Sequence, residues 1–138
     1  MKTMKQNMTE RNKSILKQAF KTIFEENQID ELTVAEFFSK DYQQWVDGHQ
    51  LDYQGFLQHL KAQRQKIATI SIEFKSVVAE KNKVATIHQV EAITQKGNPV
   101  KGKVIAHFTF ENDKIISCEE LTFFTEAKEE DRDLGSVR

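Results

Sequence analysis

The chain has 138 residues, of which 38% are hydrophobic and 30% charged, and its formal net charge is -1. This length is typical of one domain, and ten Phe residues at a nearly balanced charge exclude an intrinsically disordered chain. No apolar run is long enough to span a membrane, so we expect no membrane partner. We expect one domain over residues 1–138, with flexible ends at about 1–8 and 127–138.

Cys118 is the only cysteine, which excludes an intrachain disulfide and a cysteine-based zinc site. The basic residues near the start are not followed by an apolar run, so they do not resemble a secretory signal and we expect a cytoplasmic protein. Residues 1–21 carry six basic residues and one acidic residue. Because no aromatic residues interleave with them on the polar face of the predicted N-terminal helix and no matching basic patch lies elsewhere, we expect no nucleic-acid partner.

Two segments have the apolar spacing of amphipathic helices. The first covers residues 9–27, and the other follows Asp52, which is a typical N-cap residue. Their apolar stripes are Leu16, Phe20, Ile23 and Phe24 in the first segment, and Phe56, Leu57, Leu60 and Ile67 in the other. His59 and Arg64 fall off the second stripe, so we expect them to lie away from the buried face.

A shorter helix is predicted between these two. Thr33 and Glu36 have the spacing of a capping box, in which each side chain bonds a backbone N–H of the other residue. We expect this helix to begin at Thr33 and to end within residues 40–45, before a turn at Asp47-Gly48.

After Ile67 the hydrophobic period changes from helical spacing to alternation, which predicts strands. Four strands are expected, at residues 70–75, 84–94, 104–110 and 115–125. The longest predicted loop is Gln95–Gly102, and Asn112-Asp113 predicts a tight hairpin turn. Three helices followed by four hairpin-linked strands predict an α+β fold, with the helices packed on one face of an antiparallel sheet.

Several segments resemble the nuclear transport factor 2-like superfamily, in particular its branch of SnoaL-like polyketide cyclases and steroid-isomerase-like proteins. They read FFSKDYQQWVDG at 37–48, LDYQGF at 51–56, VATIH at 84–88 and FTFENDKIISCEELT at 108–122. The resemblance covers about residues 9–125, and the ending DRDLGS at 131–136 resembles bacterial members of the family.

The resemblance implies a cone-shaped fold, in which three N-terminal helices pack on a curved four-stranded antiparallel sheet and enclose an apolar pocket. It implies a hydrophobic small molecule as the ligand. We expect no cofactor, because the sequence has no Gly-rich phosphate loop and no nucleotide-binding fingerprint. The resemblance also implies a homodimer that forms through the outer face of the sheet.

The resemblance further implies a candidate acid–base residue. In SnoaL-like cyclases the last strand supplies an acidic residue shortly after a Gly-Lys-Ile-type turn, and Glu120 stands at the matching offset from Lys114-Ile115. A carboxyl group in an apolar pocket has a raised pKa, which suits proton transfer. Because neighbours on a strand alternate between faces, the alternative is that Glu119 faces inward and Glu120 faces solvent.

His88 is the second candidate catalytic residue, because the family alignment places its side of the strand inside the cone. Two positions depart from the family pattern: steroid isomerases have a protonated Asp where Ala106 stands, and many relatives have a His where Trp45 stands. His107 lies on the polar face of its strand, so we expect it to face outward. The register across the Gln95–Gly102 loop leaves open whether the two histidines share a face, and no metal site is expected.

Other positions are expected to line the pocket. Tyr42, Trp45 and Tyr53 each combine an apolar ring with a polar tip, which suits a pocket mouth. The full set of expected pocket residues is Tyr42, Trp45, Tyr53, Phe56, Phe74, Ala106, Phe108 and Cys118.

Three functions remain open from the sequence. The first is a protein that binds an apolar small molecule without a reaction. The second is a cyclase or isomerase that uses Glu120 as acid and base, with His88 or Tyr53 as the donor to an oxyanion. The third is a dimeric interaction module without a working pocket. A cavity that touches both Glu120 and His88 would favour the second.

Overall fold

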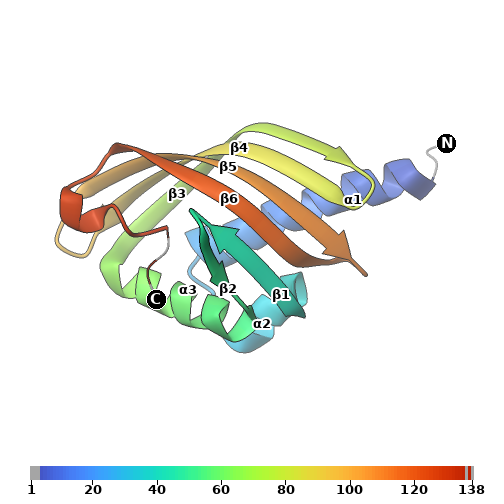
Figure 1. The fold of residues 1–138 in the computed structure, drawn as a ribbon, viewed down its shortest axis with the longest axis horizontal. Coiled ribbons are helices and arrows are strands. Elements are labelled where there is room, and N and C mark those ends of the chain that lie inside the picture. The colour runs from blue at the N-terminus through green and yellow to red at the C-terminus, as the bar shows by residue number, and fades with distance from the viewer. Residues whose placement is uncertain (1–3, 136, 138) are drawn as a thin grey trace.

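The computed structural model describes residues 4–135 and 137. Within these residues none of the helices is long and apolar enough to cross a membrane. The helical elements, shown in Figure 1, are α1 (Met4–Ala19), the π-helical turn η1 (Phe20–Glu25), α2 (Glu31–Phe37), α3 (Tyr53–Lys66) and the short 3-10 helix η2 (Glu129–Asp131). The strands are β1 (Phe38–Val46), β2 (His49–Leu51), β3 (Ile67–Glu80), β4 (Lys83–Thr94), β5 (Pro99–Glu111) and β6 (Lys114–Glu126).

The described strands form one sheet in the order β2-β1-β6-β5-β4-β3. All neighbours are antiparallel except β1 and β6, which run parallel. The predicted α+β class, with three helices packed on a curved sheet, is confirmed. The sheet has two strands more than the predicted four, because β1 and β2 extend it beyond β6.

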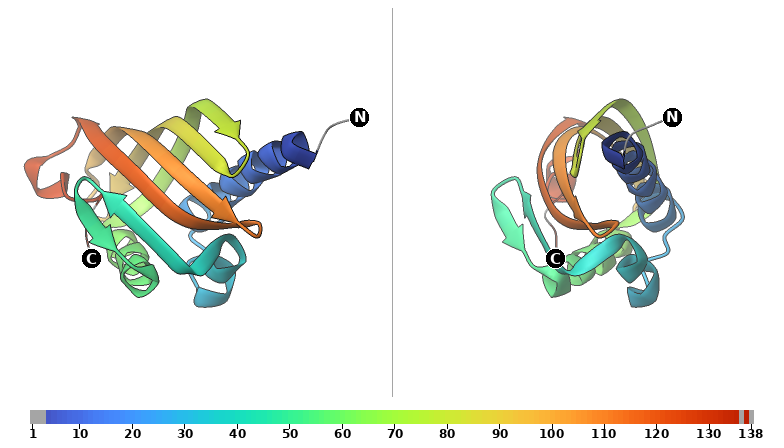
Figure 2. Two further views of the ribbon diagram at one scale, coloured as in Figure 1. Left: turned by 45° about the vertical axis from the view of Figure 1, so that its right-hand side comes forward. Right: turned by 90° about the vertical axis from the view of Figure 1, so that its right-hand side faces the viewer.

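The sheet is strongly curved. Its pairing register shifts between Phe74 and Ser76 in β3 and between Thr109 and Phe110 in β5, and such bulges bend a strand and increase its twist. Figure 2 shows that strands β3 to β6 form a strongly curved sheet. Helix α1 lies along β3, and α2 and α3 lie below the sheet in these views. The concave face therefore carries the main core, whose largest fully buried side chains include Phe38, Leu16 and Ile23.

The helix starts follow local side-chain chemistry. Asp52 caps α3 as predicted, since its carboxylate accepts a hydrogen bond from the backbone N–H of Gly55 at 2.8 Å. The predicted start of α2 at Thr33 is wrong. Asp30 is the N-cap, and its carboxylate accepts from the Thr33 N–H at 3.0 Å and from the Thr33 hydroxyl at 2.8 Å. The hydroxyl of Thr33 thus bonds back to the cap.

Residues 38–46 form β1, although the sequence predicts a continuing helix there. From Tyr42 onward buried and exposed residues alternate, with Gln44 and Val46 buried and Trp45 exposed. This strand pairs on one side with the short strand β2 and on the other with β6, about 75 residues further along the chain, as in the pairing of Trp45 with Glu119. The pairing with β6 leaves no local mark in the sequence, so helical spacing dominated the prediction.

Of the two connections predicted between the later strands, one has the expected form and the other is shorter than expected. Asn112 and Asp113 form the expected tight turn, and both have positive φ values, 52° and 63°, as a type I′ turn requires. The predicted loop Gln95–Gly102 is shorter than expected. Gly97, at φ +85°, donates to the Thr94 carbonyl at 2.9 Å, and β5 already begins at Pro99.

The π-helical turn η1 directs two rings into the concave face. Phe20 and Phe24 lie on it with their ring centroids 5.0 Å apart. The carbonyl of Phe24 accepts from Nη1 of Arg64 at 3.1 Å, and Oε2 of Glu25 accepts from the Ile72 N–H at 2.9 Å. These bonds tie η1 to α3 and to the edge strand β3. π-helical turns occur often at functional sites.

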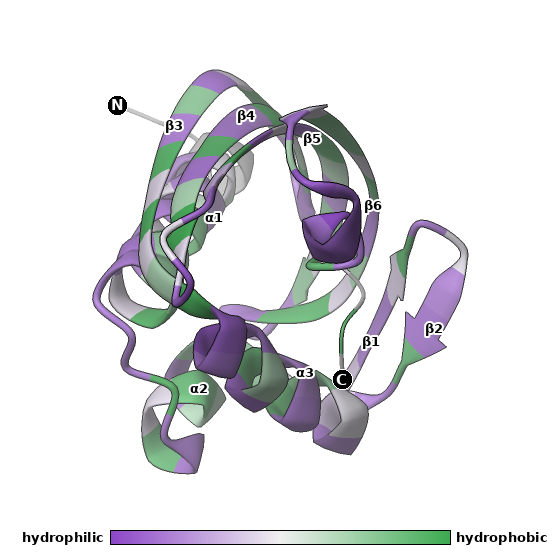
Figure 3. Ribbon diagram, turned by 90° about the vertical axis from the view of Figure 1, so that its left-hand side faces the viewer, coloured by the Kyte–Doolittle hydropathy of each residue, from purple (hydrophilic) through white to green (hydrophobic). Residues whose placement is uncertain are grey.

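The chain after β6 packs against the wide end of the curled sheet, near the β4–β5 turn (Figure 3). Asp131 and Leu134 are buried, with exposed fractions of 8% and 3%. The sequence predicts flexible ends at 1–8 and 127–138, and these ranges lie partly outside the described residues. The described part of the second range is held by side-chain and backbone contacts.

Candidate functional site

A cavity of about 110 Å³ lies between the concave face of the sheet, η1, α3 and the chain after β6. Its walls are mostly apolar and include Phe20, Phe24, Phe56, Ile70, Val90 and Val104. Its polar lining residues are Gln44, His59, Gln63, His88, Glu120 and Thr122. A concave, largely apolar cavity with a few convergent polar groups is the usual form of a small-molecule site.

Glu120 is the acidic residue of this cavity. It is half-buried on β6, directly opposite Ala106 of β5, and its Oε1 accepts a weak hydrogen bond from Sγ of Cys118 at 3.8 Å. Burial, with the negative charge of Asp47 as the second cause, raises the pKa of Glu120 from 4.5 to about 7. The carboxyl group therefore exists in both protonation states near neutral pH, as a group that shuttles protons requires.

Asp47 connects β1 to this part of β6. It has a positive φ of 51°, its N–H donates to the Glu120 carbonyl at 3.0 Å, and its Oδ1 accepts from the Thr122 N–H at 2.8 Å. The parallel pairing of β1 and β6 thus ends in two hydrogen bonds made by Asp47, one with Glu120 itself and one with Thr122, two residues further along β6. The sequence assigns Asp47 to a turn, which is correct, but the pairing that brings its charge near Glu120 is not visible there.

His88 lines the cavity from β4 and has an exposed fraction of 3%. The ring of Phe20 stands edge-on to it at 5.2 Å, and Oγ1 of Thr86 is 3.0 Å from Nδ1. Burial lowers the pKa of His88 to about 4, so the ring is neutral at pH 7. If the hydroxyl of Thr86 donates to Nδ1, the proton of the ring resides on Nε2 and is available to a ligand oxygen.

Gln44 is a polar lining residue that the sequence did not predict. Its Oε1 accepts from the hydroxyl of Tyr42 at 2.9 Å, which leaves its Nε2 group as the donor. Tyr42 lies behind the lining, with its ring 4.8 Å from those of Phe38 and Phe56. Burial, with the nearby Cys118 and Glu120, raises the pKa of Tyr42, so its hydroxyl remains a donor and fixes the orientation of Gln44.

The other predicted aromatic residues differ in their distance from the cavity. Phe56 lines it directly. Phe74 and Phe108 stand outside its lining and support it, because their rings pack on Phe20 at 5.3 Å and 5.7 Å. Ala106 and Cys118 are also buried behind the lining.

Trp45 and Tyr53 do not reach the cavity. Trp45 lies beside Glu119 on the outer side of the sheet, with an exposed fraction of 37%. Tyr53 is buried at the start of α3, where burial and, second, the negative charge of Glu31 raise its pKa. Its hydroxyl is therefore near α2 rather than near Glu120, so Tyr53 is not a donor to an oxyanion in this cavity.

The two histidines of the central strands lie on opposite faces of the sheet. His88 is paired with Val104 and faces the cavity, whereas His107 is paired with Glu119 and is exposed. The predicted outward position of His107 agrees with this register. Within the described residues no three His, Cys, Asp or Glu side chains are grouped as metal ligands would be.

The sequence also missed His59 and Gln63 on α3 and Thr122 on β6. His59 lies off the main apolar stripe, yet it has an exposed fraction of 5%, because the chain after β6 covers that side of α3. A signal for Thr122 was available, since it is two residues from Glu120 and so shares its face of β6.

A family model for the SnoaL-like domain matches residues 17–118. The chain therefore belongs to the SnoaL-like family. A fission-yeast protein named "Uncharacterized protein C11D3.04c" (Schizosaccharomyces pombe) is 35% identical over 131 residues, which cover 95% of this chain and 100% of that protein. The ending that resembles bacterial members therefore does not restrict the family to bacteria.

Solved structures share the fold at low sequence identity. AclR from Streptomyces galilaeus has a TM-score of 0.72 at 15% identity, covering 94% of this chain and 83% of AclR. An LEH-like epoxide hydrolase from M. tuberculosis has a TM-score of 0.70 at 14% identity, covering 83% and 84%. IdmH from Streptomyces antibioticus, a candidate polyketide cyclase, has a TM-score of 0.69 at 12% identity, covering 80% and 91%. These similarities establish the nuclear transport factor 2-like fold.

Proposed function

We propose that the protein binds an apolar carbonyl compound in this cavity and that Glu120 transfers a proton at the carbon next to the carbonyl. The observation that carries the proposal is that Glu120 and His88 line the same cavity. This arrangement favours an acid–base enzyme over a protein that only binds a ligand. Relatives of the same fold named as an epoxide hydrolase and a candidate polyketide cyclase also support a reaction on small molecules.

The proposed step needs a base and donors to the oxygen. The ionised carboxylate of Glu120 takes the α-proton, and the electron pair of the broken C–H bond moves to give an enolate with its charge on oxygen. The Nε2–H of neutral His88 and the Nε2 group of Gln44 are the donors available to that oxygen. Glu120 then returns the proton to the same or another carbon, which gives exchange or isomerisation.

The reaction can be tested with simple ketones as probes. We expect the wild-type protein in D2O at neutral to mildly alkaline pH to accelerate deuterium incorporation at the α-carbons of 2-alkanones from 2-butanone to 2-nonanone, measured by proton NMR. Buffer alone and heat-denatured protein are the controls. Absence of any acceleration across the series would overturn the proposed reaction.

Asp47→Asn is expected to lower the pKa of Glu120 from its value of about 7, because the substitution removes the negative charge that helps to raise it. Asn retains an Oδ1 that can accept from the Thr122 N–H, so the local structure is kept. The pKa is measured by NMR titration of the Glu120 carboxyl carbon. Asp41→Asn, an equal charge change at an exposed β1 position, is the control. An unchanged titration midpoint in Asp47→Asn would contradict this role.

We also propose that two copies associate through the outer face of the sheet. Ile87, Ile105 and Leu121 stand opposite one another on β4, β5 and β6, and each is exposed there. Phe123, also on β6, is 70% exposed. Lys103 and Glu119 flank this row, so a two-fold axis through it would place opposite charges near each other.

Leu121→Glu is expected to shift the protein from dimer to monomer, because it places a charge within the apolar row. The measurement is sedimentation velocity over a range of concentrations, with circular dichroism to verify the fold. Glu73→Gln, a change at an exposed β3 position outside the row, is the control. A wild-type protein that stays monomeric at high concentration would contradict the dimer.

A further inference from the structure

We propose that Leu134, carried by the chain segment after β6, forms the end wall of the cavity and thereby sets the length of the ligand that the cavity accepts. The inference rests on the proposed function, because it takes this cavity as the ligand site. The wall is not part of the sheet. It is a side chain held in place by residues 127–135 and 137, which we call the C-terminal strap.

Leu134 closes one end of the cavity. It lines the cavity with an exposed fraction of 3% and packs in a cluster with Ile67, Ala92 and Val100. These three residues belong to the start of β3, the end of β4 and the start of β5, and therefore to one end of the curled sheet. The side chain of Leu134 fills the space that they surround.

The cavity extends from this wall toward the polar residues. Apart from Glu120, its residues on β4, β5 and β6 form three successive cross-strand rows, which are Ala92–Val100, Val90–Gly102–Phe124 and His88–Val104–Thr122. Leu134 contacts the first row. Glu120, paired with Ala106, belongs to the next inward-facing row after the last one. Ala92 and His88 are separated by four residues of strand, or about 13 Å. A ligand whose oxygen lies near His88 and Glu120 therefore extends its hydrocarbon part toward Leu134.

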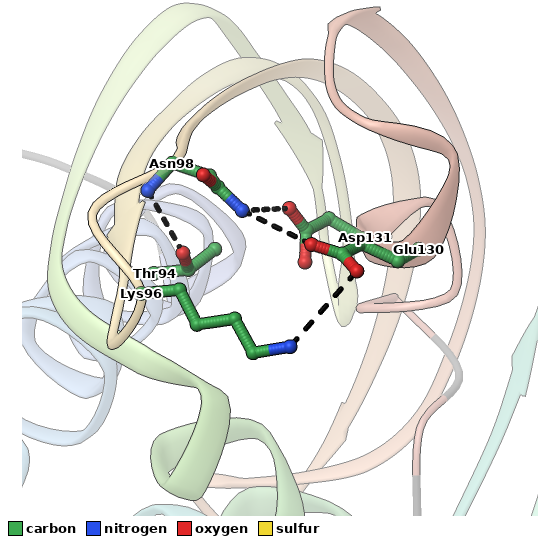
Figure 4. Close-up of polar contacts among 5 residues, drawn as sticks. All are labelled: Thr94, Lys96, Asn98, Glu130 and Asp131. Atoms are coloured by element: carbon green, nitrogen blue, oxygen red, sulfur yellow. Dashed lines mark hydrogen bonds and ion pairs between the residues drawn. The ribbon is translucent and has the colours of Figure 1, made fainter.

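Two sets of polar contacts hold the strap. Figure 4 shows the first, in which Nδ2 of Asn98 in the β4–β5 turn donates to Oε1 of Glu130 at 3.2 Å and to Oδ2 of Asp131 at 3.4 Å. Nζ of Lys96 lies 3.9 Å from Oε2 of Glu130, and Oγ1 of Thr94 accepts from the Asn98 N–H at 3.0 Å, which fixes the turn. The turn between β4 and β5 thus binds η2 of the strap through hydrogen bonds and an ion pair.

The second set joins the strap to α3. Nε2 of Gln63 donates to the carbonyl of Leu134 at 3.1 Å, and Nδ1 of His59 contacts the carbonyl of Val137. Nζ of Lys66 lies 3.7 Å from Oδ2 of Asp133. None of these contacts involves the side chain of Leu134. That side chain can therefore be shortened while the strap keeps its anchors.

The strap also passes close to the acid–base residues. A Cβ placed on Gly135 would lie 3.2 Å from Oγ1 of Thr122 and 3.5 Å from Oδ2 of Asp47. Gly135 thus permits a close approach of the backbone to β6, the strand that carries Glu120, and to Asp47. The wall and the reactive group belong to one cavity, so the length limit applies to the same ligand on which Glu120 acts.

The test measures binding of 2-alkanones from 2-butanone to 2-nonanone by isothermal titration calorimetry. We expect the affinity of the wild-type protein to rise with chain length and then to fall at a cutoff, because each added methylene buries apolar surface until the wall is reached. Leu134→Ala is expected to move the cutoff to chains longer by about two to three carbons, and Leu134→Val by about one, since these are the carbons removed from the side chain.

The matched control is Leu32→Ala, which removes the same atoms from an exposed position on α2, outside the cavity and the outer face of the sheet. It is expected to leave the cutoff unchanged. Thermal unfolding verifies that each variant folds, and Leu134→Val serves as the milder change if Leu134→Ala does not fold.

The outcomes separate the inference from the proposed function. A cutoff that moves with the size of residue 134, or ketone binding that appears only in the shortened variants, supports the wall. If the ketones bind and the cutoff does not move, the wall is overturned while the proposed site stands. If no ketone binds to any folded variant, the cavity is not a ketone site, and both proposals fail.

Discussion

Glu120→Gln is expected to reduce the rate of α-deuterium exchange in bound ketones by about 10²- to 10⁴-fold, the usual contribution of a positioned general acid or base. Gln has nearly the shape of Glu but cannot take up the proton. Ketone binding by the variant should remain close to that of the wild type, because the apolar walls carry most of the contact area. The rate is followed by proton NMR in D2O at several ketone concentrations.

Glu119→Gln is the matched control for this experiment. Glu119 precedes Glu120 on the same strand but is exposed on the outer face, opposite His107. Its replacement should leave the exchange rate unchanged. The wild-type rate should rise as the pH increases through about 7, because only the ionised Glu120 acts as the base. Full activity in Glu120→Gln would contradict the role of this carboxylate.

The same substitution is expected to stabilise the folded protein at alkaline pH. The pKa of Glu120 is raised from 4.5 to about 7 in the folded state, so the stability linked to this carboxyl is complete below pH 4.5 and is lost as the pH rises through 7. The loss corresponds to about 3 kcal/mol of unfolding free energy. Glu120→Gln should therefore match the wild type at about pH 4 and exceed it by about 3 kcal/mol at about pH 8.

The measurement is urea unfolding of both proteins across this pH range, with protein concentration held constant. Glu119→Gln again serves as the control and should show no pH-dependent difference from the wild type. A wild type that equals Glu120→Gln in stability at pH 8 would show that the Glu120 carboxylate ionises in the folded state without cost.

The parts of the fold predicted from the sequence are those set by neighbouring residues. The cap of α3 by Asp52 and the turn at Asn112-Asp113 depend on side chains and dihedral angles within a few residues, so they were predicted correctly. The strand β1 was missed because its main partner β6 lies far along the chain and pairs in parallel, and because its local partner β2 is only three residues long. The Asp30 cap was missed because Thr33 and Glu36 offered an alternative capping pattern at nearly the same place.

The residues of the candidate site also differ in whether the nearby sequence could predict them. Glu120 and His88 came from the resemblance and from alternation along a strand, and the structure places both at the cavity. The position of Trp45 was predicted wrongly because residues 38–46 were expected to be helical, and a helix and a strand direct the same side chains to different faces. Gln44 was missed for the same reason. Leu134 lies in a polar tail, and nothing near it in the sequence indicates that two other segments hold it over a cavity.

The first helix continues directly from α1 into the π-helical turn η1, and the two parts have different roles. Upstream of η1, Asn12 donates to the Lys81 carbonyl in the β3–β4 turn, and Leu16 is fully buried. Phe20 and Phe24, four residues apart on η1, both line the cavity. One helical segment thereby both fixes a hairpin at one end of the sheet and supplies cavity wall further along.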